Sequence, residues 1–259
     1  MSGYKAMAYQ TLRVREQPGI RFVQLYRPEA QNALNTRLIH ELTEILGGLE
    51  DNPSVNVVVL EGLPDVFCSG MDFQEYVNLE GDGELRMADT FTLFRKLAES
   101  SKIIVAKVQG KVNAGGIGLV AASDLVVAES TAFFALPELL FGLLPAMVLP
   151  FLIRRVGHQR AKLLALSTQP IGAAEAHRWG LVDVYGAELD QLLLPYLQRW
   201  RRLSPLSIRK LKTYMNQLQP IDNATQTLAV KTIAAAMGEA EVKAGIRRYV
   251  EDGSAPWSQ

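Results

Sequence analysis

One acidic residue stands alone in a long apolar stretch of the sequence. Glu138 is the only ionisable group between Thr131 and Arg154. If its carboxyl group is buried, removal from water raises its pKa toward neutrality, which is the property that a general acid or base needs. Because Glu138 follows Pro137, it could equally lie in the first turn of a solvent-exposed helix and stabilise the N-terminus of that helix. The residue types leave both interpretations open.

Two segments rich in small residues could offer backbone amides to a ligand. The first is residues 66–73 (VFCSGMDF) and the second is residues 110–116 (GKVNAGG). Where such a segment leads into a helix, unpaired N–H groups and the helix dipole favour a negatively charged oxygen. Two amides aimed at one oxygen form an oxyanion hole, and removing one donor typically costs about 3–4 kcal/mol of transition-state stabilisation. The alternative is that the glycines only permit tight packing in ordinary turns.

Hydrophobic patterns predict the elements that must position these residues. Val55–Leu60 and Ile103–Val108 are short apolar runs, typical of strands covered on both faces, and they precede the first and the second small-residue segment. A helix is expected over Ile117–Ala122, directly after the second segment. Further strands are expected at Leu125–Ala128 and Ala132–Ala135. These patterns indicate an α/β arrangement in which strands lead into both small-residue segments.

Other elements are predicted on either side of this centre. Alternation indicates a strand pair near the N-terminus, in which a turn at residues 17–19 is followed by the strand Ile20–Tyr26. Apolar residues at helical spacing predict helices over Thr36–Glu50 and Thr90–Ser100. A short strand is expected near Leu181–Tyr185.

The hydrophobic pattern of the sequence changes toward its C-terminal end. From about Glu188 to Tyr249 the pattern is helical throughout. We therefore expect an α/β core in residues 1–190 and a helical C-terminal region in residues 191–259.

The composition argues against several classes of protein. The 259 residues include 27 Lys+Arg and 27 Asp+Glu, and this zero net charge argues against a nucleic-acid binder. The single cysteine, Cys68, excludes an intrachain disulfide, and three widely separated histidines predict no metal site. No signal peptide is expected, and the longest apolar stretch is broken by Pro145 and Pro150, so no membrane span is expected. We expect a cytoplasmic protein.

Five motifs in order resemble the crotonase (enoyl-CoA hydratase/isomerase) superfamily and together cover nearly the whole chain. They are Arg27–Leu34, Phe67–Asp72, Gln109–Gly116 followed by Asp124, Pro137-Glu138 followed by Gly142 and Pro145, and Ala173–Gly180 followed by Leu181-Val182. The resemblance implies an α/β fold built as a spiral of repeated β-β-α units. It also implies that residues 191–259 help to build a homotrimer or a dimer of trimers.

The resemblance further implies a thioester substrate on a phosphopantetheine arm and no cofactor of the enzyme's own. The thioester oxygen would lie between the amides of Met71 and Gly115, which would stabilise an enolate, while Glu138 would transfer protons. These three are the predicted catalytic groups. The residues expected to bind the substrate are Asp72, Lys111, Asn113 and Gly116.

One position departs from the family pattern. Hydratases of the family that use two catalytic glutamates carry the first at the position matching Gly118, and only the second, Glu138, is present here. A single carboxylate would therefore carry out most of the proton transfer.

Four segments narrow the resemblance to the dehydratases of polyketide β-branching. They are residues 58–64, 110–116 and 138–155, and the ending that runs from Arg247 through Trp257. Those enzymes remove water from (S)-3-hydroxy-3-methylglutaryl groups on an acyl carrier protein and give the 3-methylglutaconyl thioester. The resemblance thus implies an acyl carrier protein as partner. Lys111 is predicted to bind the distal carboxylate of the substrate, with Arg86 or Lys96 as alternatives.

Three other functions stay open at this point. The chain could be a hydratase or isomerase of free acyl-CoA, or it could decarboxylate the 3-methylglutaconyl thioester. Because the first glutamate is missing, it could also bind thioesters without turning them over.

Overall fold

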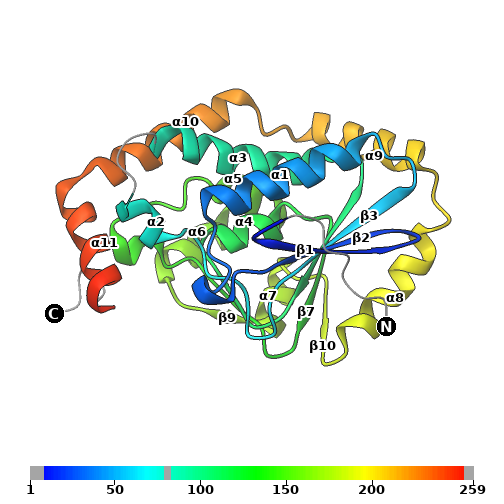
Figure 1. Ribbon diagram of the computed structural model, residues 1–259, viewed down its shortest axis with the longest axis horizontal. Helices are drawn as coiled ribbons and strands as arrows, with labels where there is room; N and C mark the ends of the chain where they lie inside the picture. Colours follow the sequence, from blue (N-terminus) through cyan, green and yellow to red (C-terminus); the bar gives the residue numbers. More distant parts are fainter. Residues whose placement is uncertain (1–8, 79–82, 254–259) are drawn as a thin grey trace.

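The computed structural model describes residues 9–78 and 83–253, and their strands form two sheets. The larger sheet has the order β1-β2-β3-β5-β7-β10. All neighbouring strands in it run parallel except β1, which is antiparallel to β2. Their bounds are β1 Leu12–Gln17, β2 Gly19–Leu25, β3 Val55–Glu61, β5 Ile103–Val108, β7 Leu125–Glu129 and β10 Val184–Gly186 (Figure 1).

A smaller sheet has the order β4-β6-β8-β9, and its strands are β4 Val66–Cys68, β6 Lys111–Asn113, β8 Phe133–Ala135 and β9 Ile171–Gly172. Three pairs of consecutive strands are divided between the sheets: β3-β4, β5-β6 and β7-β8. In each pair the first strand belongs to the larger sheet and the second to the smaller one. Helical segments follow each pair in turn: α2 Phe73–Asn78 with α3 Gly83–Glu99, then α4 Gly115–Ala121, then η2 Glu138–Phe141 with α5 Leu149–Val156. The predicted spiral of β-β-α units is confirmed.

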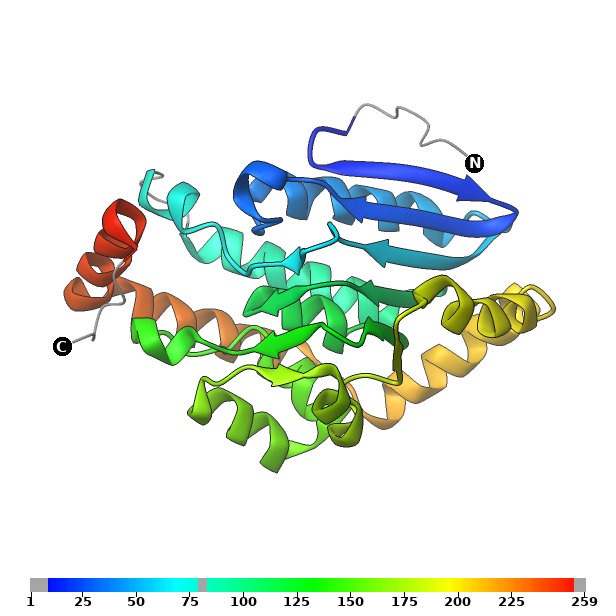
Figure 2. The ribbon, with the colours of Figure 1, turned by 90° about the horizontal axis from the view of Figure 1, so that it is seen from below.

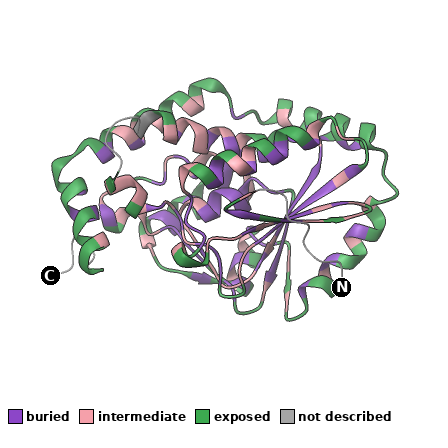
Figure 3. Ribbon diagram, viewed as in Figure 1, coloured by how far each residue is buried: buried purple, intermediate pink, exposed green. Residues whose placement is uncertain are grey.

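Both faces of the larger sheet are buried. Along β3, Val57 and Val59 face one apolar cluster, and Val58 and Leu60 face the other, because successive side chains point to opposite sides of a strand. Helices α8 (Leu189–Trp200) and α9 (Pro205–Leu218) contribute to the first cluster, and α1 (Thr36–Glu50), α3 and α4 contribute to the second. The strands in Figure 3 are accordingly buried, while the outer sides of the helices are exposed.

The last two helices return to the β-β-α units. Helix α10 (Asn223–Gly238) packs on α3, and α11 (Ala240–Asp252) contacts α2 and η2. Figures 1 and 2 show these two helices at the opposite end of the molecule from α8. The C-terminal helices therefore reach the region that contains Glu138. The remaining helical segments are η1 Pro28–Ala30, α6 His158–Ser167 and α7 Ala173–Trp179.

Several predicted elements differ from the observed ones. The helices expected over Thr90–Ser100 and Ile117–Ala122 begin earlier, at Gly83 and Gly115. Strands β4 and β6 lie within the two segments predicted to be turns, because strands of three residues are too short to show an alternating pattern. Residues 254–257 of the motif that begins at Arg247 lie outside the described residues.

No helix of the described residues is long and apolar enough to cross a membrane. No cluster of three His, Cys, Asp or Glu side chains with the geometry to hold a metal ion occurs among these residues.

Candidate active site

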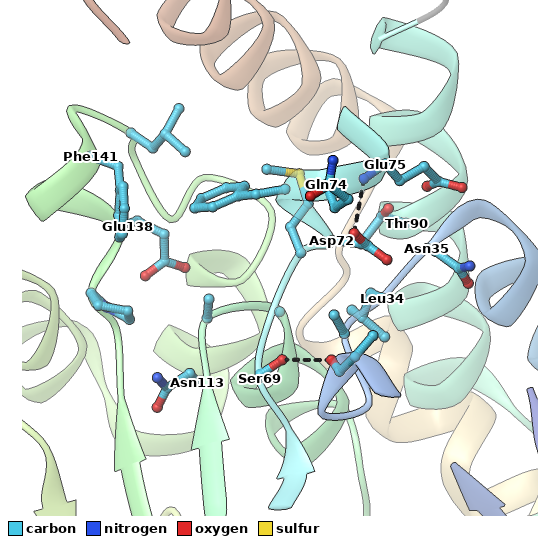
Figure 4. A pocket seen from close by; sticks show the side chains of 18 of the residues that line it. Leu34, Asn35, Ser69, Asp72, Gln74, Glu75, Thr90, Asn113, Glu138 and Phe141 are labelled. Atoms are coloured by element: carbon cyan, nitrogen blue, oxygen red, sulfur yellow. Dashed lines mark hydrogen bonds between the residues drawn. The ribbon is translucent and has the colours of Figure 1, made fainter. Parts of the chain in front are cut away.

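A cavity of about 970 Å³ lies where the small sheet meets α2, α3, η2 and α11. Figure 4 shows the side chains that project into it from both small-residue segments and from η2. Of the seven residues predicted to act on or bind the substrate, six line this cavity: Met71, Asp72, Lys111, Asn113, Gly115 and Glu138. Gly116 does not; it is buried against the backbone of Cys68.

Glu138 is the first residue of η2, directly after Pro137, and its carboxylate faces the cavity. Its Oε2 atom is buried and has no hydrogen-bond partner among the described residues. Burial raises the pKa of Glu138 to about 7, and its own backbone N–H acts weakly in the opposite direction. Glu138 lies in a first helical turn, but its carboxyl group is desolvated, so the interpretation as a buried group is confirmed and that as a solvent-exposed helix residue is wrong.

Aromatic rings form one wall beside η2. The ring of Phe141 lies 5.1 Å from that of Phe73 and 4.9 Å from that of Tyr249, in both cases edge to face. These rings come from η2, α2 and α11, and all three line the cavity. The C-terminal helix therefore helps to keep water from the segment that carries Glu138.

The amide of Met71 is left free by a short bridge to Leu34. The N–H of Leu34 donates to the carbonyl of Gly70 at 2.7 Å, and the N–H of Asp72 donates to the carbonyl of Leu34 at 3.1 Å. Because successive amides of extended chain point to opposite sides, the N–H of Met71 points away from Leu34.

The amide of Gly115 is free for a different reason. Gly115 is the first residue of α4, so no carbonyl lies one turn before it to accept its N–H. Ala114, which precedes it, has φ +48° and ψ −117°, an unusual backbone conformation for a residue with a side chain.

The two segments touch at Gly70. This glycine has φ +107°, and a Cβ atom on it would lie 2.8 Å from the Cβ of Ala114. The carbonyl carbon of Gly70, which is bonded to the nitrogen of Met71, lies 3.9 Å from where a Cβ of Gly115 would be. The peptides that carry both predicted donors are therefore in direct contact, which supports the predicted oxyanion hole.

Buried polar groups from the first motif hold the Met71 segment in place. Asn32 is fully buried; its Oδ1 accepts from the N–H of Arg27 at 2.8 Å, and its Nδ2 donates to the carbonyl of Phe67 at 3.1 Å. Arg27 in turn forms an ion pair with Asp72 at 2.9 Å. The other carboxylate oxygen of Asp72 accepts from the N–H of Glu75 at 2.9 Å (Figure 4).

Asp72 thus lines the cavity with both carboxylate oxygens already engaged by the protein. This geometry gives Asp72 a positioning role, while the prediction that it binds the substrate stays a prediction. The sequence predicted no role for Asn32, although it lies within the motif Arg27–Leu34.

The position of the missing glutamate is filled by an aromatic ring. A Cβ atom on Gly118 would lie 2.4 Å from Cε2 and Cζ of Phe94. Phe94 comes from α3 and lines the cavity. A glutamate at position 118 would therefore collide with Phe94, so Glu138 fills the one of the two catalytic glutamate positions that remains.

Among the described residues that line the cavity, the cations are Arg27 and Lys111. Arg27 is paired with Asp72, whereas Lys111 forms no ion pair within the described part of the chain. Arg86 and Lys96 do not line the cavity. Lys111 is therefore better placed than either alternative to meet an anionic group of a ligand.

Comparisons with known proteins agree with this geometry. The sequence matches the enoyl-CoA hydratase/isomerase family over residues 15–259. It is 42% identical over 254 residues to the bacillaene synthase dehydratase PksH of Bacillus subtilis (strain 168), covering 97% of this chain and 98% of that protein. It is 31% identical over 250 residues to the mevalonyl-coenzyme A hydratase sidH of Aspergillus fumigatus, covering 93% and 92%.

A solved structure shares the fold closely. The crystal structure of pksH from Bacillus subtilis, described as a polyketide biosynthesis enoyl-CoA hydratase, has a TM-score of 0.90 and 41% sequence identity. The match covers 95% of this chain and 99% of that one.

Burial of Glu138 predicts a dependence of stability on pH. The pKa of its carboxyl group rises from 4.5 to about 7 on folding, so the folded state is penalised once the group must ionise. Relative to wild type, Glu138→Gln should gain stability as pH rises from about 4.5 to about 7, and the gain should level off at about 3–4 kcal/mol above that range. Urea unfolding of both proteins between pH 4 and pH 9 measures this difference. A difference that does not change with pH would contradict the assigned burial.

Proposed function

The chain belongs to the enoyl-CoA hydratase/isomerase family and is a hydro-lyase, and from this premise we propose that it is a dehydratase of polyketide synthesis. Its proposed substrate is the (S)-3-hydroxy-3-methylglutaryl group on an acyl carrier protein, and its proposed product is the 3-methylglutaconyl thioester. The observation that carries the proposal is Glu138, a cavity carboxylate with a buried and unpaired oxygen, together with Phe94, which fills the space of a second catalytic glutamate at position 118. The 42% identity to a bacillaene synthase dehydratase supports the pathway.

The reaction begins at the thioester carbonyl. In the proposal, its oxygen accepts hydrogen bonds from the amides of Met71 and Gly115, which stabilise the negative charge that develops when C2 loses a proton. Fixed backbone dipoles are effective here because they need no reorientation as the charge forms. The enolate character of the transition state is thereby favoured over the neutral ground state.

Glu138 then moves the proton from carbon to oxygen. Its ionised carboxylate takes the C2 proton, and the resulting acid gives that proton to the C3 hydroxyl as the C3–O bond breaks. Water leaves, the C2–C3 double bond forms, and the carboxylate is regenerated. A pKa of about 7 suits a group that must accept and donate in one turnover. A tertiary C3 loses its hydroxyl more readily than a secondary one, which allows one carboxylate to suffice.

Lys111 is the proposed partner of the distal carboxylate. It lines the cavity, and it extends from the same strand, β6, that leads to Gly115. Because the ammonium group of Lys111 forms no ion pair within the described residues, it is available to a negatively charged acyl group. This contact would distinguish a glutaryl-type substrate from an uncharged acyl group.

A second candidate substrate is the corresponding acyl group on free coenzyme A. The relative sidH, at 31% identity, is a mevalonyl-coenzyme A hydratase, and a mevalonyl group also carries a hydroxyl and a methyl on C3. Both candidates thus share the tertiary centre and differ in the carrier. Assembly into a homotrimer or a dimer of trimers stays a prediction.

Incubation with the loaded carrier protein tests the proposed reaction. Intact-mass spectrometry of (S)-3-hydroxy-3-methylglutaryl carrier protein should show the loss of one water with wild type and no change with Glu138→Gln. Loss of carbon dioxide from 3-methylglutaconyl carrier protein, without loss of water from the hydroxy thioester, would indicate a decarboxylase, and no change of either thioester would indicate a thioester-binding protein without turnover. The same acyl group on coenzyme A, assayed in parallel, decides which carrier the enzyme prefers.

The acidity of Glu138 sets the pH dependence of the rate. Because the carboxylate must be ionised to accept the C2 proton, kcat/KM should rise with pH through about 7 and then become constant. Steady-state rates from pH 5 to pH 9 measure this profile. A rate that falls through the same range would show that the protonated form starts the reaction.

Removal of the Lys111 charge should change specificity rather than abolish chemistry. Lys111→Met keeps most of the aliphatic stem, and we expect kcat/KM for the 3-hydroxy-3-methylglutaryl thioester to fall about tenfold to hundredfold. The 3-hydroxy-3-methylbutyryl thioester, which lacks the distal carboxylate, should lose less than about twofold. Lys96→Met, an exposed lysine outside the cavity lining, is the matched control. Equal losses for both thioesters would remove Lys111 from this role.

A further inference from the structure

The carboxamide oxygen of Asn113, Oδ1, is buried and has no hydrogen-bond partner among the described residues. Four buried side-chain polar atoms of the described residues lack a hydrogen-bond partner, on Arg21, Asn56, Asn113 and Glu138. Only the last two of these residues line the cavity. Polar atoms buried in a folded protein are nearly always paired, so two unpaired ones in one cavity point to a ligand that pairs with them.

Asn113 is placed beside the reacting centre. It is the last residue of β6, it is paired in register with Ala135 of β8, and Gly115 follows two residues later. Figure 4 shows Asn113 and Glu138 on the same side of the pocket, while Asn35, Glu75 and Thr90 lie on the opposite side. A substrate with its thioester oxygen at Gly115 would bring C3 between the carboxamide and the carboxylate.

The chemistry of the acyl group decides which atom Asn113 contacts. A hydroxyl both donates and accepts, so it can pair with either end of a carboxamide, whereas a carboxylate can only accept from the NH₂ end. Residues 111 and 113 share one face of β6, and Lys111 supplies the cation that a distal carboxylate needs. The hydroxyl on C3 is then the polar group left without a side chain to hold it.

We propose that Asn113 binds the C3 hydroxyl of the substrate and holds its oxygen toward Glu138. This assignment rests on the proposed dehydration. The hydroxyl donates its hydrogen to the unpaired Oδ1 of Asn113, which leaves a lone pair of the hydroxyl oxygen free to accept the proton from Glu138 as the C3–O bond breaks. Asn113 neither takes nor gives a proton, so the C2 proton still passes through Glu138 alone to the departing water. The carboxamide of Asn113 thus supplies a polar contact on the same side of the cavity as Glu138. At position 118 the ring of Phe94 leaves no room for a polar side chain.

Equilibrium binding in a background without turnover isolates this contact. Glu138→Gln and the double variant Glu138→Gln with Asn113→Leu are titrated with 3-hydroxy-3-methylglutaryl and 3-methylglutaryl thioesters of one pantetheine carrier. The second thioester lacks only the hydroxyl. Asn113→Leu should weaken binding of the hydroxy thioester about tenfold and of the deoxy thioester less than about twofold. If Asn113→Leu weakens the binding of both thioesters equally, the assignment is overturned. If it weakens only the binding of thioesters that carry the distal carboxylate, Asn113 contacts that carboxylate and not the hydroxyl.

A matched control and a second ligand pair keep the test independent of folding and of the proposed substrate. Asn56 is also a partly buried asparagine with an unpaired Oδ1, and it lies outside the cavity lining, so Asn56→Leu should leave both affinities unchanged. If Asn113→Leu does not fold, Asn113→Ala takes its place.

The 3-hydroxybutyryl and butyryl thioesters of coenzyme A form the second pair. A hydroxyl-selective loss with this pair supports Asn113 even if wild type fails to dehydrate the 3-hydroxy-3-methylglutaryl carrier protein. No selective loss with either pair overturns the assignment whatever the true substrate is.

Discussion

The close approach of two backbone segments, at Gly70 and Ala114, is the constraint on which the rest of the site depends. No side chain fits between them, because a Cβ atom on Gly70 would lie 2.8 Å from that of Ala114. Each segment is also anchored from behind: Asn32 holds the strand that leads to Gly70, and the N–H of Ala114 donates to the carbonyl of Ala135 at 3.0 Å. That second bond ties the segment to β8, three residues before Glu138. A small shift in either anchor would therefore move an amide donor relative to the carboxylate.

Glu138 is retained at a cost to the folded state. An acidic group in a desolvated position with an unpaired oxygen opposes folding at neutral pH, whereas a neutral side chain of the same shape would not. The same desolvation gives the carboxyl group an acidity matched to proton transfer. Phe94 keeps the space beside Gly118 apolar, because its ring fills that space.

Periodic patterns could be predicted from the sequence, and contacts between distant elements could not. The helix Thr36–Glu50 was predicted to the residue, because six buried apolar side chains recur along it at helical spacing. The apolar surroundings of Glu138 made a buried carboxyl group one of two open interpretations, since a long run without other charges is visible in one segment. The position of the Phe94 ring over Gly118 depends on how α3 crosses α4. The unpaired Oδ1 of Asn113 depends on the absence of a hydrogen-bond donor near it among the described residues. Neither is visible in the local sequence.

The aromatic rings beside η2 come from parts of the chain that are far apart in the sequence. Phe73 and Phe141 belong to the β-β-α units, but Tyr249 comes from the last described helix. These contacts cost loop-closure entropy, because more than 100 residues separate Tyr249 from Phe141. Undocking of α11 alone would open this side of η2 to solvent while both sheets stay assembled. The dry surroundings of Glu138 therefore depend on the stability of one helix, α11, as well as on that of the sheets.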